Sequence, residues 1–141
     1  MNAPFFGATD TQVARNLELD TYTCNGTIAQ GDAVSLDTSV SGALQGQTII
    51  KAALSATGNA NVVGIAMSAG SAGKIIQVCR RGYVQANVKA STTCAGKGLV
   101  VAATAGQLEP YAAGTHTSAA PSAIGVDDSA ASGLTYVFAK F

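Results

Sequence analysis

The sequence predicts a mainly β protein: a compact small barrel or sandwich of short antiparallel strands, built from two related halves, with an N-terminal arm. Three observations predict this fold class. Helical periodicity is nearly absent, and apolar residues come in short or alternating runs of strand length. Clusters of Gly, Ser, Thr, Asn and Asp, the residues that turns require, separate the runs. Many short strands at close spacing are typical of sandwiches and small barrels.

Eight runs are interpreted as strands. In chain order they are 12–19 (QVARNLEL), 33–36 (AVSL), 48–54 (TIIKAAL), 61–67 (NVVGIAM), 74–79 (KIIQVC), 82–88 (GYVQANV), 98–103 (GLVVAA) and 134–141 (LTYVFAKF). The first two are the weaker candidates, and Arg15 interrupts the apolar face of the first. The other six are rich in the β-branched and aromatic residues that favour strands.

Four sequence landmarks occur twice, in the same order and at nearly the same spacing. They pair Gly31–Leu36 with Gly96–Val101, Gly42–Leu44 with Gly106–Leu108, Val63–Ile65 with Ile124–Val126, and Gly73–Val78 with Gly133–Phe138. This recurrence predicts an N-terminal arm and lead-in strand over 1–26 and a single β-rich domain over 27–141. Within that domain we expect quasi-repeats at about 27–89 and 90–141.

Composition limits the classes of partner. A chain of 141 residues is one domain by length, and its eight basic residues balance eight acidic ones. This charge provides no electrostatic footprint for nucleic acid or for an anionic membrane, and no apolar run approaches the length of a membrane span. The first residues lack the pattern of a secretory signal. Because many of the 48% apolar residues are alanine, we expect a core that is thin or shared with another chain.

The three cysteines predict neither a disulfide framework nor a metal site. Cys24, Cys79 and Cys94 are odd in number, widely spaced and without a CxxC pair. We therefore expect reduced, partly buried thiols, and we expect neither a metal nor a cofactor.

The stretch Ser68–Ile75 (SAGSAGKI) resembles the beginning of a phosphate-binding loop but lacks its essential features. Ser68 stands where the first glycine is needed, and Ile75 stands where a hydroxyl would bind magnesium. The residues after Lys74 favour a strand, whereas phosphate binding needs a helix N-terminus there. We interpret the stretch as a turn that leads into the next strand.

No group of residues predicts catalysis, so we expect that the protein is not an enzyme. His116 is the only histidine and lies in a loop of small residues, which predicts a surface position. Asp127 and Asp128 form the only adjacent acidic pair, which is interpreted as a solvated turn because the ligand spacing of a calcium site is missing.

Two residue pairs are candidates for partner binding. Phe5 and Phe6 are adjacent aromatic residues in an arm of small and polar residues, which suggests that the arm docks on a partner. Arg80 and Arg81 are the only adjacent basic pair. Neighbours on a strand point to opposite faces, so these two form one patch only if the strand bulges there. Otherwise they are a strand-end pair in solvent, or one of them forms a salt bridge to a partner subunit.

The ordered series GDAVSL, VVGIAMSAGSAGKIIQVCRRGYV, GLVV and AIGVDDSAASGLTYVF resembles the capsid decoration, or cement, proteins of tailed bacteriophages. The similarity spans about 27–141. It implies a mainly β, non-enzymatic protein that binds the outer surface of an expanded icosahedral head after synthesis in the host cytoplasm. The implied partner is the major capsid protein, and the implied state is a homotrimer at three-fold and quasi-three-fold positions.

Two other functions remain open from the residues. The protein could be another phage virion structural component, such as a head fibre, tail or minor capsid protein. It could also be a small enzyme or ligand-binding domain, which would require a deep polar pocket containing His116 with Asp127 or Asp128.

Overall fold

The structure, a computed structural model, describes residues 17–53, 62–116, 121–129 and 133–141. These residues form a single hydrogen-bonded sheet in the order β1-β3-β2-β4-β5-β9-β8-β6-β7. The strands are β1 (Glu18–Cys24), β2 (Ala33–Leu36), β3 (Thr48–Lys51), β4 (Val62–Ala66), β5 (Ile75–Asn87), β6 (Gly98–Val101), β7 (Leu108–Pro110), β8 (Ala123–Gly125) and β9 (Leu134–Lys140), with one 3₁₀ turn, η2 (Gly42–Leu44). The predicted mainly β fold is confirmed. The N-terminal arm falls largely outside the described residues.

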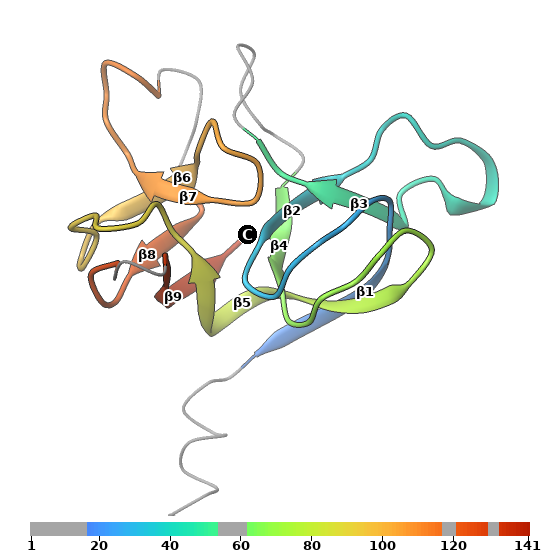
Figure 1. The fold of residues 1–141 in the computed structure, drawn as a ribbon, viewed down its shortest axis with the longest axis horizontal. Helices are drawn as coiled ribbons and strands as arrows, with labels where there is room; N and C mark the ends of the chain where they lie inside the picture. The colour runs from blue at the N-terminus through green and yellow to red at the C-terminus, as the bar shows by residue number, and fades with distance from the viewer. Residues whose placement is uncertain (1–16, 54–61, 117–120, 130–132) are drawn as a thin grey trace, which may run out of the picture.

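The first half of the sheet closes into a five-stranded barrel, which we call barrel 1. β1 pairs antiparallel with the first part of β5 and parallel with β3, so the order β1-β3-β2-β4-β5 returns to β1. Closure leaves few unpaired strand edges. Barrel 1 is the lobe that contains β1 to β4 in Figure 1.

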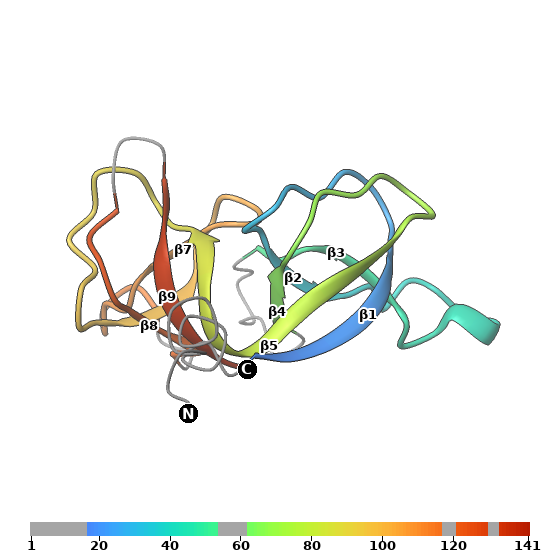
Figure 2. The same cartoon turned by 90° about the horizontal axis from the view of Figure 1, so that it is seen from below.

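The second half of the sheet, barrel 2, contains the last part of β5 together with β9, β8, β6 and β7. β5 pairs with β9 from Arg81 to Asn87, and a parallel bridge between Val88 and Leu108 brings β7 back to the end of β5. The long, curved β5 therefore passes from one lobe to the other, as Figure 2 shows. The described residues thus form a closed five-stranded barrel and a second five-stranded lobe that one isolated bridge completes; the two share β5, and we keep the name barrel 2 for the second lobe.

The two barrels repeat one pairing pattern. In barrel 1, β2 lies between β3 and β4, and β4 pairs with β5. In barrel 2, β6 lies between β7 and β8, and β8 pairs with β9. β1 in barrel 1 corresponds to the last part of β5 in barrel 2, because each runs antiparallel to one neighbour and reaches a parallel bridge at its end. This common pattern accounts for the two related halves of the predicted fold class.

Several predicted strand boundaries are wrong. The weak strand predicted at 12–19 begins only at Glu18, and 12–16 lie outside the described residues. The strand predicted at 48–54 ends at Lys51, and the one at 98–103 ends at Val101. The runs 74–79 and 82–88, predicted as two strands, form the single strand β5. β7 and β8 were not predicted, because three residues are too few to display a period of two.

A shared core joins the barrels. Barrel 1 encloses its own cluster of buried side chains, which contains Ile28, Val34, Ile49 and Ile76 among others. The second cluster fills barrel 2 and also includes residues from barrel 1 strands. Its members are Ala33, Ala52, Ile65, Cys79, Val84, Ala86, Val88, Cys94, Leu99, Val101, Leu108, Ala123, Val137 and Ala139. Because β2 is buried on both of its faces, the two barrels pack as one unit.

The three thiols are expected to be unreactive in the folded protein. Cys24, Cys79 and Cys94 are free and at most 2% exposed, and burial raises the pKa of each thiol above its usual value. Thiol reagents attack the thiolate, so both effects slow the reaction. Titration with Ellman's reagent should detect no fast-reacting thiol in the native protein and all three in denaturant. A fast-reacting thiol under native conditions would contradict this assignment.

Candidate functional site

The predicted partner-binding residues are only partly described. Phe5 and Phe6 lie outside the described residues. Arg80 and Arg81 are both exposed, because the register of β1 against β5 shifts by one residue between Glu18 and Leu19. This is the bulge that the sequence analysis required for the two arginines to share one side of the strand.

The two arginines differ in their surroundings. Arg80 Nη1 lies 3.2 Å from Asp20 Oδ2, and both side chains are about half exposed. Such a pair contributes little to stability because water screens it. Arg81 lies opposite Lys140 of β9 in the sheet, so the two bases occupy one cross-strand row.

The stretch that resembles a phosphate-binding loop is a turn, as the sequence predicts. The Lys74 amide donates to the Ser71 carbonyl at 3.0 Å, and the Gly73 amide donates to the Cys24 carbonyl at 2.8 Å. β5 follows at once from Ile75. These two amides are thus used within the fold, and a strand stands where phosphate binding needs a helix.

The surface position predicted for His116 is wrong: its side chain is only 3% exposed. His116 Nδ1 accepts the Ala112 amide at 2.8 Å, which leaves the proton on Nε2, 3.1 Å from Glu109 Oε1. The ring thus closes the loop after β7 by bonding at both nitrogens. Its partner is Glu109, seven residues earlier, and not Asp127 or Asp128.

The acidic pair has a structural role in joining two turns. Asp128 Oδ1 accepts the amides of Cys94 at 2.9 Å and Ala95 at 3.0 Å, and the Asp127 carbonyl accepts the Cys94 thiol. These backbone hydrogen bonds hold the pKa of Asp128 below its usual value, the Ala95 amide having the largest effect. The pair fastens the β8–β9 turn to the loop before β6.

Because the pKa of Asp128 is lowered in the folded state, the free energy of unfolding should fall at acid pH. A carboxylate whose pKa is lower in the folded state stabilises that state above the unfolded pKa of about 3.9, and this contribution is lost as pH falls through the folded pKa. The free energy of unfolding of Asp128→Asn should therefore fall less than that of the parent chain when the pH drops below about 4. Urea denaturation between pH 2 and pH 7 measures this, with the exposed Asp127→Asn as the control. The same decrease in unfolding free energy below pH 4 for Asp128→Asn and for the parent chain would contradict this prediction.

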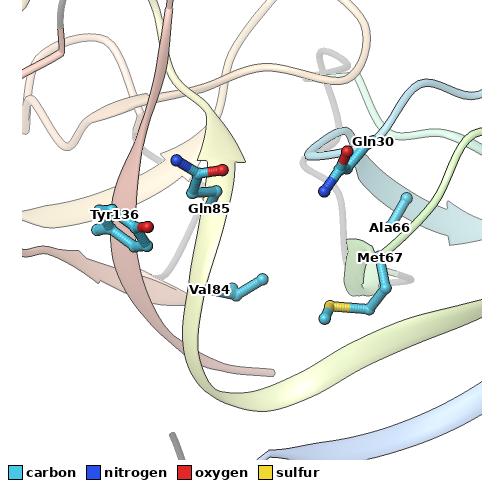
Figure 3. A pocket seen from close by; sticks show the side chains of 6 residues that line it. All are labelled: Gln30, Ala66, Met67, Val84, Gln85 and Tyr136. Atoms are coloured by element: carbon cyan, nitrogen blue, oxygen red, sulfur yellow. The ribbon is translucent and has the colours of Figure 1, made fainter. Parts of the chain in front are cut away.

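A pocket lies between the barrels. Gln30, Ala66 and Met67 line it from barrel 1, and Val84, Gln85 and Tyr136 line it from β5 and β9; Met67 and Val84 point toward one another across it (Figure 3). Its volume of about 90 Å³ is far below the ~300 Å³ of a typical small-molecule site. A second pocket, beside Leu36 and Gln45, measures about 220 Å³. Neither volume suits a nucleotide or a drug-sized ligand.

The most distinctive surface is an aromatic face on the outside of barrel 2, formed by Tyr83, Ile124, Tyr136 and Phe138. Phe138 of β9 lies opposite both Tyr83 of β5 and Ile124 of β8, and opposed residues share one face of a sheet. The Tyr83 and Tyr136 rings stack with their centroids 4.7 Å apart. Phe138 and Ile124 remain 39% and 38% exposed.

The aromatic face carries apolar surface that could bind a macromolecule. Of the eight exposed large apolar residues in the described chain, four lie on or beside β8 and β9: Ile124, Val126, Leu134 and Phe138. Contiguous exposed apolar surface marks interaction sites more often than scattered residues do. The adjoining cross-strand row at its edge is charged, with Glu18, Arg81 and Lys140 side by side.

Sequence reasoning missed this face, although part of the signal was present. Tyr136 and Phe138 alternate with the buried residues Thr135 and Val137, so their common side could be predicted from the strand period. Tyr83 and Ile124 join them only through the register of three strands. That register is a property of the folded sheet.

Two features are absent from the residues that the structure describes. No helix in the described ranges is long and apolar enough to cross a bilayer. No three His, Cys, Asp or Glu side chains of these residues gather in a group that could hold a metal ion.

Comparison with known proteins gives matches in structure. No protein-family model matches the chain, and no curated protein matches it in sequence. The chain is similar to the N base of the head fiber gp8.5 of bacteriophage phi29, with a TM-score of 0.60 and 13% identity over 88% of this chain and 94% of that chain. It is also similar to a chain in the capsid of Myoviridae phage XM1, with a TM-score of 0.64 and 15% identity over 90% of this chain and 85% of that one. The protein therefore has a fold that also occurs in the base of a phage head fiber and in a phage capsid structure.

Proposed function

We propose that this protein is a structural component of a tailed-phage virion, and that it decorates the head: it binds the outer surface of the expanded icosahedral shell and stabilises it. The observation that carries the proposal is that the fold, over more than four fifths of each chain, occurs in two proteins of phage heads. The ordered landmarks that resemble decoration proteins support it independently.

The proposed action is stabilisation by binding, without catalysis. A protein that binds only the expanded shell stabilises that state by mass action. The major capsid protein is the proposed partner, and a homotrimer at three-fold and quasi-three-fold positions would contact several subunits at once, which adds avidity. The small volumes of the two pockets and the closed hydrogen bonding of His116 favour a non-enzymatic role.

The test uses heads that lack the protein. Purified protein should bind expanded heads to saturation, should leave unexpanded heads unoccupied, and should raise the temperature at which the expanded heads release their DNA. Sedimentation followed by gel densitometry measures occupancy, and the mass of the free protein in solution measures the oligomer. Absence of binding, or binding with no change in the release temperature, would overturn the decoration role.

A second candidate is a head-fibre base, favoured by the similarity to the phi29 head fiber base. The two candidates differ in what cryo-electron microscopy of the native particle would show. Decoration requires density of this size at repeated positions over the facets. A fibre base requires that each such density continue outward into further protein.

A further inference from the structure

The aromatic face is an exposed apolar surface, and the described part of the chain begins close to it. Tyr83, Phe138 and Ile124 form one cross-strand row, and Arg81 and Lys140 form the next row. Glu18, the first residue of β1, lies opposite Arg81. β1 therefore begins one two-residue step, about 7 Å along β5, from the first row of the aromatic face.

The first described residue, Leu17, fixes this starting point. Leu17 is partly buried against the core cluster that both barrels share, whose members include Ile65 of barrel 1 and Val84 of barrel 2. Leu17 therefore packs on the core that both barrels share, one residue before Glu18 in the row of Arg81.

The length of the segment matches the distance to be spanned. Ten residues separate Phe6 from Leu17, and a flexible chain of that length has a root-mean-square span of roughly 17 Å. The row of Phe138 is one two-residue step from the row of Arg81, and the row of Tyr136 is two steps, about 14 Å, away. A tether whose span matches its target gives a high effective concentration, which favours the segment of the same chain over that of another.

The chemistry of the segment also matches the face. Residues 1–16 contain one acidic side chain, Asp10, and one basic side chain, Arg15, so their side chains carry no net charge that would attract them to a charged surface. Phe5 and Phe6 are their only aromatic residues. Aromatic side chains pack favourably against other rings, and here Tyr83, Tyr136 and Phe138 supply them.

We propose that residues 1–16 dock on the aromatic face of their own chain, with Phe5 and Phe6 as the anchoring side chains. The docked segment covers apolar surface that the barrel leaves exposed. The proposal is independent of head binding, because it concerns the free protein in solution.

The test uses the absence of tryptophan from the sequence. Phe5→Trp and Phe6→Trp each give the full-length protein a single fluorescent reporter. Docking predicts that at least one reporter emits to the blue of the same residue in a peptide of residues 1–16 and is better protected from acrylamide. The shift should be independent of protein concentration, and adding Phe138→Ser or Ile124→Ser should abolish it.

The matched control is Ile75→Ser, which removes a residue that is 67% exposed on the part of β5 in barrel 1 and should leave the shift intact. Far-UV circular dichroism shows that each variant is folded, and the two serine variants of the face serve as substitutes for one another. Peptide-like emission from both reporters would overturn the proposal. A blue shift that grows with concentration would overturn it in favour of the segment of a second copy. A blue shift that survives both face variants would place the segment elsewhere and also overturn it.

Discussion

Gly64→Ala and Gly125→Ala are each expected to lower the free energy of unfolding by about 3 kcal/mol or more. A β-carbon on Gly64 would overlap the carbonyl oxygen of Cys79 and lie 2.7 Å from Val78 Cγ1. One on Gly125 would overlap the carbonyl oxygen of Cys94 and lie 2.7 Å from its carbonyl carbon. The obstructing atoms belong to the backbone, so relief requires part of the sheet or a neighbouring loop to move.

The control for these variants is Gly114→Ala. No atom lies within 4 Å of a β-carbon placed on Gly114, and its backbone is outside the left-handed region, so we expect a change within about 0.5 kcal/mol. Urea denaturation followed by circular dichroism measures all three variants. A midpoint for Gly64→Ala or Gly125→Ala equal to that of Gly114→Ala would show that the sheet accommodates the extra carbon.

These two glycines also show how much of the fold the sequence contains. Val63–Ile65 and Ile124–Val126 were recognised as a repeated step, and each places a glycine where a neighbouring carbonyl approaches the α-carbon. The repeated glycine could therefore be detected in the sequence, and its physical cause is that a close carbonyl leaves no room for a β-carbon. The partner carbonyl, from Cys79 in one case and Cys94 in the other, could not be predicted because it depends on how strands pair.

The boundaries that sequence reasoning missed have local physical causes. The alternation of β5 breaks at Cys79 and Arg80, where the bulge brings two buried and then two exposed residues together, so one strand was interpreted as two. Likewise, the small residues around His116 are typical of a surface loop. The hydrogen-bond partners that hold its ring in the buried position are Glu109 and the Ala112 amide. Only the folded loop brings these partners to the ring.

The sequence also did not predict the seam between the barrels, by which we mean the contacts of Asp32 where barrel 1 meets the last part of β5. Its carboxylate is 1% exposed and accepts the Ala29 amide at 2.8 Å and the Asn87 side chain of β5 at 3.2 Å. Lys51 Nζ of β3 lies 3.0 Å from the same carboxylate. Nearby, the Ala33 amide donates to Gly106 of barrel 2 at 2.9 Å. One side chain thus connects a turn and a strand of barrel 1 to the last part of β5.

Asp32→Ala is therefore expected to cost roughly 3 kcal/mol of unfolding free energy, because it removes a buried carboxylate and leaves the Ala29 amide, the Asn87 side chain and Lys51 without their partner. Asp32→Asn should cost less, since its amide oxygen still accepts a hydrogen bond but the ion pair with Lys51 is lost. The matched control is Asp20→Ala, which removes the exposed pair with Arg80 and should change stability by at most about 1 kcal/mol.

Double-mutant cycles separate the contribution of each ion pair from the hydrogen bonds. The cycle for Asp32 and Lys51 should give a larger coupling energy than the cycle for Asp20 and Arg80, because water screens the exposed pair more strongly. Since Asp32 lies at the seam, its loss should also make unfolding less cooperative, with a lower denaturant slope and separate transitions for the two barrels. An Asp32→Ala protein that unfolds in one transition with the stability of Asp20→Ala would show that the Asp32 side chain is not needed to join the barrels.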